Sequence, residues 1–196
     1  HMPVHLGAMP EAVRQVQLLA PWHQGDLAIL NDPYLGGTHL PDVSIIAPVF
    51  AGRTLLGFAA SRVHHSDIGG MSPGSMPLSR ELLQEGVVIP PLMLRRRGRM
   101  NEELYALILR NVRTPDERRG DFEAQVAAVE IGGRRLVALA QRYGVARLRR
   151  AMDALLDYSA RLAAIELRQV PDGVYEAEDV LEDSGFGSGP LPIRVR

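Results

Sequence analysis

The chain has 196 residues, of which 46% are hydrophobic and 23% are charged, and a chain of this length can bury a core without disulfides. Its 22 Lys and Arg residues nearly balance 23 Asp and Glu residues, for a net charge of −1, which excludes a global attraction to nucleic acid or to a membrane surface. It contains no cysteine, which excludes a disulfide framework and a thiolate metal site. No apolar run approaches the roughly 20 residues of a transmembrane helix, and we expect a cytoplasmic protein without a membrane or nucleic-acid partner.

The first third of the chain predicts a helix, a short strand and a β-hairpin. Apolar residues at helical spacing from Met9 to Ala20 predict an amphipathic helix. The apolar run from Leu27 to Leu30 predicts a short buried strand. Two further apolar runs, at 43–50 and 55–63, flank a short glycine-containing connection, which is typical of a β-hairpin.

The middle of the chain predicts helices. Asn101 is expected to cap the N-terminus of one helix, and Thr114 begins a second helical region that runs to Gly144. We expect Gly132-Gly133 to break or kink this second helix, because glycine is a poor helix former. A last helix is expected over 146–168, with an apolar stripe that points to a core and consists of Leu148, Met152, Leu155, Leu162 and Ile165.

The expected fold is α+β: an N-terminal sheet that contains the hairpin, a helical middle region and a C-terminal strand. Alternating residues predict strands at 174–177 and 193–195, and the basic run at 95–99 is interpreted as a solvated turn. We expect a single domain over residues 3–196, and we interpret His1-Met2 as remnants of an expression vector.

The hairpin brings residue types that bind metals together. Counting outward from the centre of the turn places Arg62 opposite Asp42, and His64, two residues further along, shares the face of Asp42. A single bulge would give that place to His65 instead. His39 lies three residues before Asp42 in a loop rich in glycine and proline, which is free to turn both side chains towards one point. His39, Asp42 and His64 therefore predict a site with two imidazoles and one carboxylate.

Imidazole and carboxylate ligands suit Mn²⁺, Zn²⁺ or Fe²⁺, and three protein ligands leave positions open for water or substrate. The same donor set holds iron in non-haem Fe(II) oxygenases. In the alternative without a metal, these residues are polar groups that bond the loop backbone.

Further residues have candidate roles around this site. His65 or Asp67 would orient a ligand or move a proton, and Glu85 would act as a general base or support a ligand. A solvated surface position is the alternative for Glu85. We interpret His5 and His23 as ordinary polar residues outside the site.

Six segments that are spread over nearly the whole chain carry a family resemblance: NDPYLGGTHLPD, HHSDIGG, GGMSPGS, QEGVVIPPL, NVRTPDERRGDFEAQ and DGVYEAEDVLED. Together they resemble the B subunit of the ATP-dependent hydantoinase and oxoprolinase family, which includes the corresponding subunit of acetone carboxylase. The fifth segment also contains three polar residues that either face the site or, as we favour, lie on a helix surface: Arg113, Asp121 and Gln125.

The resemblance implies an activity and a division of labour. Members of the family act on cyclic amides such as hydantoins and 5-oxoproline, or carboxylate ketones, with ATP bound by a separate subunit or domain. The metal of the carboxylase member would map onto His39, Asp42 and one of His64 or His65. Subunits of this family are much longer, so the resemblance also implies that this chain is part of a longer subunit.

We therefore expect a catalytic subunit of an ATP-coupled cyclic-amide hydrolase, of the hydantoin or 5-oxoproline type. We expect this subunit to depend on manganese or zinc and to belong to a hetero-oligomer. A hydantoinase A-like partner would bind the ATP, because this chain contains no G-x-x-x-x-G-K-[ST] loop. The ring carbonyl, activated by phosphorylation on the partner, would be attacked by hydroxide at the metal. The alternatives are a ketone carboxylase subunit, a non-haem Fe(II) oxygenase and a non-catalytic assembly domain.

Overall fold

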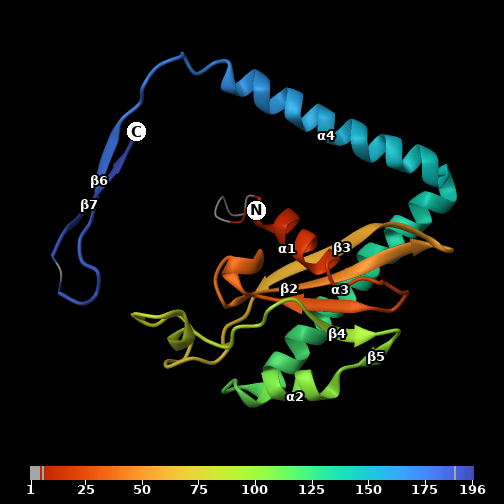
Figure 1. Ribbon diagram of the computed structural model, residues 1–196, viewed down its shortest axis with the longest axis horizontal. Helices are drawn as coiled ribbons and strands as arrows, with labels where there is room; N and C mark the ends of the chain where they lie inside the picture. Colours follow the sequence, from red (N-terminus) through yellow and green to blue (C-terminus); the bar gives the residue numbers. More distant parts are fainter. Residues whose placement is uncertain (1–4, 6, 188) are drawn as a thin grey trace. The chain divides into compact units, whose positions relative to one another are not determined.

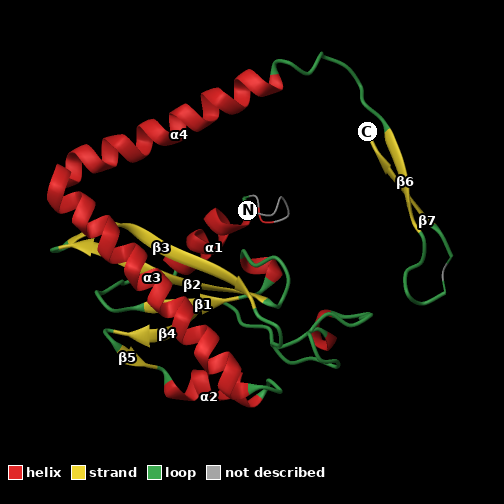
Figure 2. Cartoon of the chain, turned by 180° about the vertical axis from the view of Figure 1, so that it is seen from behind, coloured by secondary structure: helices red, strands yellow, loops and turns green. Residues whose placement is uncertain are grey.

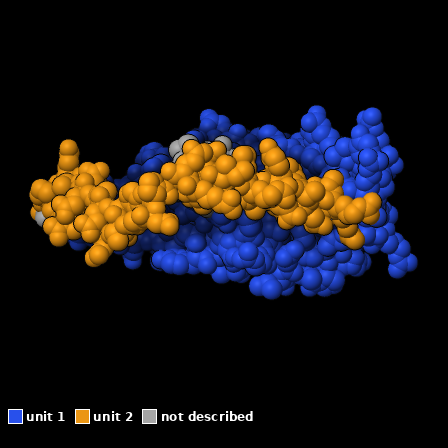
Figure 3. Space-filling model, turned by 90° about the horizontal axis from the view of Figure 1, so that it is seen from above, with its two compact units in different colours: residues 1–148 blue, residues 149–196 orange. Residues whose placement is uncertain are grey.

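The computed structural model (Figures 1 and 2) describes residues 5, 7–187 and 189–196, so His1-Met2 lie outside the described residues. The chain divides into two compact units, residues 1–148 and 149–196 (Figure 3), and we describe each by itself. The expectation of a single domain stays a prediction, because a division by internal contacts does not show whether either unit folds alone.

The fold is α+β, as the sequence predicts. In chain order, the elements of the first unit are α1 (Ala8–Gln17), β1 (Leu27–Leu30), the 3₁₀-helix η2 (Pro33–Leu35), β2 (Asp42–Ala51), β3 (Thr54–His64), the 3₁₀-helix η3 (Leu82–Gln84), β4 (Leu92–Arg96), β5 (Arg99–Met100), α2 (Glu102–Arg110) and α3 (Pro115–Tyr143). Helix α4 (Val145–Leu167) begins at the end of the first unit, and the second unit also contains the hairpin strands β6 (Ala177–Leu181) and β7 (Leu191–Val195).

An antiparallel sheet in the order β3-β2-β1-β4-β5 forms the centre of the first unit. Strand β1 covers the predicted residues, and β2 and β3 form the predicted hairpin. The basic run at 95–99 contains the expected solvated turn, and its flanking residues also belong to β4 and β5. The turn itself lies at Arg97 and Gly98, where φ is 47° and 81°. Strands this short show too little alternation to be recognised in a sequence.

Helices cover both faces of the sheet, α1 on one face and α2 and α3 on the other (Figures 1 and 2). The alternation of β1 produces this arrangement, because neighbouring side chains of a strand point to opposite faces. Leu30 packs in a cluster with Val16 of α1, whereas Ile29 packs in a larger cluster with Ile108 of α2 and Phe122 of α3. We call these two sides of the sheet the α1 face and the α3 face.

Helix α3 continues through Gly132 and Gly133, so the glycines do not break the helix. A Cβ atom at Gly132 would lie 3.8 Å from Ala59 Cβ of β3, and one at Gly133 would lie 3.5 Å from Val49 Cγ2 of β2. The two glycines therefore lie where α3 crosses the hairpin closely. Packing of this helix against the sheet outweighs the low helix propensity of glycine, which costs only about 1 kcal/mol per residue.

The apolar stripe of α4 does not face a core within the described residues. Leu155, Leu162 and Ile165 are 64%, 46% and 53% exposed, so the expectation that they are core residues is wrong for this chain. Only Leu148, at the start of the helix, packs against a buried cluster, which contains Ala140. Helical spacing identifies an apolar face but does not identify what covers it.

Candidate metal and catalytic site

Asp42 and His64 lie directly opposite each other at the open end of the β2-β3 hairpin. The predicted pairing of Asp42 with Arg62 is wrong, because two features each shift the register by one residue. The turn is one residue shorter than expected, and a bulge follows next to Val49 and Phe50. Each one-residue shift reverses the face on which a side chain lies. Two such shifts restore the original face, so His64 still shares the α1 face with Asp42.

The loop between β1 and β2 carries His39 to the same place. Its first residue, Asn31, is buried and donates to the carbonyl of Leu40 at 2.8 Å, which draws the two ends of the loop together. Asp32 caps η2 by accepting a hydrogen bond from the Tyr34 backbone at 2.9 Å. Hydrogen bonds within the loop thus fix its path, as its content of Asn, Asp, Gly and Pro predicts.

Asp42 is the centre of the site. It is 1% exposed, and its Oδ2 atom accepts a hydrogen bond from Thr38 Oγ1 at 2.5 Å. The same oxygen lies 2.8 Å from His39 Nδ1 and 2.7 Å from His5 Nε2. The His64 ring lies beside that of His39, with 5.0 Å between the ring centroids. The structure therefore brings together the three residues that the sequence assigns to a metal.

His5 is a residue that sequence reasoning missed, and its interpretation as a polar residue outside the site is wrong. It precedes α1, 37 positions before Asp42, and it reaches the carboxylate because α1 packs on the same face of the sheet. No local spacing in the sequence could have indicated this contact. His23 makes other contacts: its ring nitrogens lie near Asp26 and Arg97.

The Asp42 carboxylate is held in its charged form. Burial by itself raises its pKa, because a buried charge loses hydration. The hydrogen bond from Thr38 and the interactions with His39 and His5 act in the opposite direction and together outweigh burial, so the pKa lies below 3.8. At neutral pH the site therefore contains a buried negative charge surrounded by imidazoles.

The donor set fits a divalent cation such as Mn²⁺ or Zn²⁺. The imidazole nitrogens of His5 and His39 lie at hydrogen-bond distance from Asp42 Oδ2, at 2.7 and 2.8 Å. In the part of the chain that the structure describes, no group of three or more His, Cys, Asp or Glu side chains could hold a metal ion as the side chains stand. A cation would therefore replace the direct contacts between the imidazoles and the carboxylate.

His65 points away from this site and into the α3 face. It is 1% exposed, and its ring packs on Phe122 with 4.4 Å between centroids. Its Nε2 atom lies 3.3 Å from Gln125 Oε1. Burial lowers the pKa of His65 and favours its neutral form. These contacts are those of a core residue, and the catalytic role of His65 stays a prediction.

Gln125 is buried, so the expectation that it lies on a helix surface is wrong. Its side-chain amide donates to the backbone carbonyls of Val43 at 2.8 Å and Ser61 at 3.0 Å. One residue of α3 thus bonds both strands of the hairpin. This bonding holds the hairpin against α3 from the face opposite the site.

Asp67 and Glu85 are not brought to Asp42 either. Asp67 is buried and accepts hydrogen bonds from the Arg113 backbone at 2.6 Å and from Arg113 Nη1 at 2.9 Å. It thereby ties the segment after β3 to the connection between α2 and α3. Glu85 ends η3 and accepts a hydrogen bond from Ser79 Oγ at 2.6 Å. Catalytic roles for both residues stay predictions.

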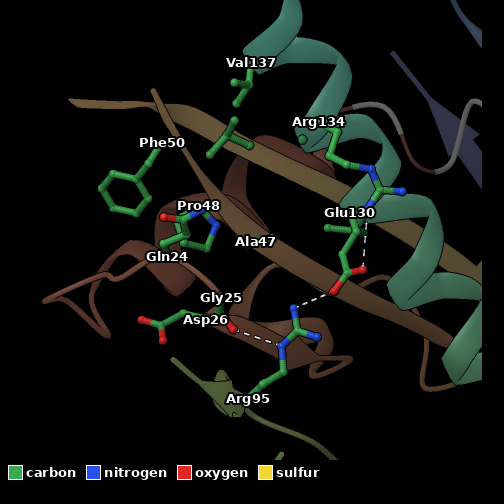
Figure 4. A pocket seen from close by; sticks show the side chains of 13 residues that line it. Gln24, Gly25, Asp26, Ala47, Pro48, Phe50, Arg95, Glu130, Arg134 and Val137 are labelled. Atoms are coloured by element: carbon green, nitrogen blue, oxygen red, sulfur yellow. Dashed lines mark hydrogen bonds and ion pairs between the residues drawn. The ribbon is translucent and has the colours of Figure 1, made fainter. Parts of the chain in front are cut away.

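A pocket of about 370 Å³ lies elsewhere, between α3 and the far end of β2 (Figure 4). It is lined by residues such as Ala47, Phe50 and Val137, and the candidate site residues do not line it. Arg95 projects into it but is already bonded, to Glu130 at 2.7 Å and to the Gly25 carbonyl at 2.9 Å. The pocket is therefore separate from the candidate site at Asp42.

Comparison with known proteins shows the family of this chain. The whole chain, residues 1–196, matches the sequence model of the family described as Hydantoinase B/oxoprolinase. The chain belongs to the hydantoinase B/oxoprolinase family. This membership confirms the resemblance that the six sequence segments indicate.

This family member is 37% identical over 201 residues to the caprolactamase subunit beta of Pseudomonas jessenii, covering 100% of this chain and 34% of that subunit. Its fold matches the crystal structure of the ATP-dependent caprolactamase from Pseudomonas jessenii with a TM-score of 0.88 and 35% identity, over 99% of this chain and 35% of that one. A nucleotide-free acetone carboxylase shares the fold, with a TM-score of 0.73 and 20% identity over 98% of this chain and 27% of that one. The chain thus spans about one third of the length of these relatives. None of the helices in the described residues is long and apolar enough to span a membrane.

Proposed function

We propose that this chain is the metal-binding, catalytic part of an ATP-coupled cyclic-amide hydrolase, with His39, Asp42 and His64 as ligands to Mn²⁺ or Zn²⁺. The observation that carries the proposal is the buried, charged carboxylate of Asp42 in contact with two imidazoles. A buried carboxylate is costly unless a partner offsets its charge. His5, which contacts the same oxygen, is a further donor to the cation.

The bound cation would polarise the amide carbonyl and lower the pKa of a water molecule. Residues of the protein would support the bound cation in three ways. Asp42 supplies the negative charge, and the Thr38 hydroxyl fixes the orientation of the carboxylate. His39 and His64 present neighbouring rings, and His64 is exposed to solvent. His5 adds a second imidazole at the Asp42 oxygen through its Nε2 atom.

The relatives favour a hydrolase over the alternatives. The relative at 37% identity is named a caprolactamase subunit, and a lactam is a cyclic amide. Acetone carboxylase shares the fold at 20% identity, which does not carry its activity over to this chain. The oxygenase alternative rests only on the donor set. In the assembly-domain alternative, the Asp42 cluster serves only to hold the loop by hydrogen bonds.

We expect the purified chain to bind one Mn²⁺ per molecule, and His39→Ala to lose this binding while it stays folded. The His39 ring is half-buried in a loop and contributes little to the apolar core, so its removal costs affinity and not stability. Electron paramagnetic resonance of free Mn²⁺ measures the bound fraction, and circular dichroism measures folding.

His23→Ala is the matched control, because His23 also lies on a loop near a carboxylate, that of Asp26. It should bind Mn²⁺ as the wild type does. Equal metal content in the wild type and in His39→Ala would refute the assignment.

We further propose that ATP binds to a hydantoinase A-like partner subunit and not to this chain. The similar caprolactamase is described as ATP-dependent, whereas this chain contains no P-loop sequence. Calorimetry of the isolated chain with Mg-ATP should give no saturable heat, and the chain alone should not hydrolyse 5-oxoproline or hydantoin. Saturable micromolar binding would refute this division of labour.

A further inference from the structure

We propose that Arg62 is a positioning residue, which holds the His39 loop, defined here as residues 36–39, in the place where His39 can bind the cation. This inference rests on the proposed metal site. Arg62 was the residue that the sequence placed opposite Asp42, and the structure gives it a different position and different partners.

Arg62 lies on the α1 face of β3, two residues before His64 and opposite Ser44 of β2. Its Nε atom donates to Ser44 Oγ at 2.9 Å, and its Nη2 atom donates to the Gly36 carbonyl at 2.7 Å. One planar guanidinium thus ties both strands of the hairpin to the first residue of the His39 loop. A lysine could not reproduce this bridge, because it has a single flexible donor group.

The bond to Gly36 controls the rest of the loop. Gly36 has a φ of 94°, and a Cβ atom there would lie 2.4 Å from the backbone nitrogen of Ala12, so α1 limits the loop on its other side. Thr38 and His39 follow within three residues and both contact Asp42 Oδ2. A displacement of Gly36 would therefore move both contacts of the carboxylate.

The position of Arg62 carries a cost in stability. Among the described residues, its buried Nη1 atom has no hydrogen-bond partner. An unpaired buried donor lowers stability. Burial lowers the pKa of Arg62, and the Asp42 carboxylate offsets part of this effect.

Charge and position predict opposite effects on metal binding. A guanidinium close to the site repels a divalent cation, so removal of its charge alone would tighten binding. Loss of the bridge to Gly36 would weaken binding, because supporting residues of metal ligands typically contribute about 10–100-fold in affinity. Weaker Mn²⁺ binding after the loss of Arg62 therefore indicates a positioning role, and tighter Mn²⁺ binding indicates an electrostatic one.

The test compares the wild type with Arg62→Met, Arg62→Lys and a control, Arg53→Met, in the exposed turn of the same hairpin. Mn²⁺ affinity is measured by electron paramagnetic resonance, and hydrogen exchange of residues 31–42 is measured by mass spectrometry without metal. We expect Arg62→Met and Arg62→Lys to bind Mn²⁺ about 10–100-fold more weakly, with faster exchange in the His39 loop. Arg53→Met should match the wild type in both measurements.

Tighter or unchanged Mn²⁺ binding by Arg62→Met would overturn the proposal, because the role of Arg62 would then be electrostatic or structural. This holds even if the melting temperature of the variant falls. If the wild type itself bound no Mn²⁺, the proposed metal site would fail. Hydrogen exchange in the metal-free protein would then still decide whether Arg62 holds the His39 loop. Unchanged hydrogen exchange in Arg62→Met would show that Arg62 does not hold this loop.

Discussion

Asp42→Asn is expected to reduce Mn²⁺ affinity by at least about 100-fold, more than the loss of a residue that only supports a ligand. The substitution keeps the shape of the side chain but removes the one negative charge to which Thr38, His39 and His5 all point. The folded chain should persist, because a lost hydrogen bond to a charged group costs about 1.5–3 kcal/mol. Titration of Mn²⁺ and a thermal melt of the same samples separate the two effects.

Asp32→Asn is the matched control for this prediction. Asp32 lies in the same connection, and its side chain caps η2 at the Tyr34 backbone. Asparagine caps helices as well as aspartate does, so this variant should keep both its melting temperature and its metal affinity. An Asp42→Asn variant with the affinity of the wild type would remove Asp42 from the site.

His64→Ala and His65→Ala are expected to have opposite effects, although the two histidines are adjacent. His64→Ala should lose Mn²⁺ affinity and keep its melting temperature, because its ring is exposed on the α1 face. His65→Ala should keep its affinity but lose about 2–5 kcal/mol of stability, as for other large buried side chains. For a chain of this size, such a loss lowers the melting temperature by roughly 4–20 °C.

The physical reason for the second effect is the packing of His65 on Phe122 and its contact with Gln125. His65→Phe is an informative companion, because it fills the space without a ring nitrogen and should recover part of the stability. If His65→Ala lost the metal and His64→Ala kept it, the assignment of the two faces would be reversed.

Several features followed from local sequence alone. The run from Leu27 to Leu30 is as apolar as a strand buried on both faces must be, and it forms β1 with those bounds. Asn101 caps α2 by accepting a hydrogen bond from the Leu104 backbone, because the requirement for an N-cap is itself local. The hairpin was predictable for the same reason, since its two apolar runs are joined by a short turn that contains Gly52.

The site was predictable in part. His39 and Asp42 are three residues apart, so the loop that joins them decides their convergence. The placement of His64 was correct for an incomplete reason, because the shorter turn and the bulge each moved the register by one residue. A single shift would have placed His65 beside Asp42, and sequence alone does not show how many shifts occur.

The sequence by itself determined the residue types of the site, the hairpin that approaches it and, through six matching segments, the family of the chain. Only the tertiary structure decided that His5 joins Asp42, that His65 belongs to the core and that α3 continues through Gly132 and Gly133. These three outcomes depend on how α1 and α3 pack on the two faces of one sheet. Such contacts join residues far apart in the chain, and no periodicity or spacing within a segment encodes them.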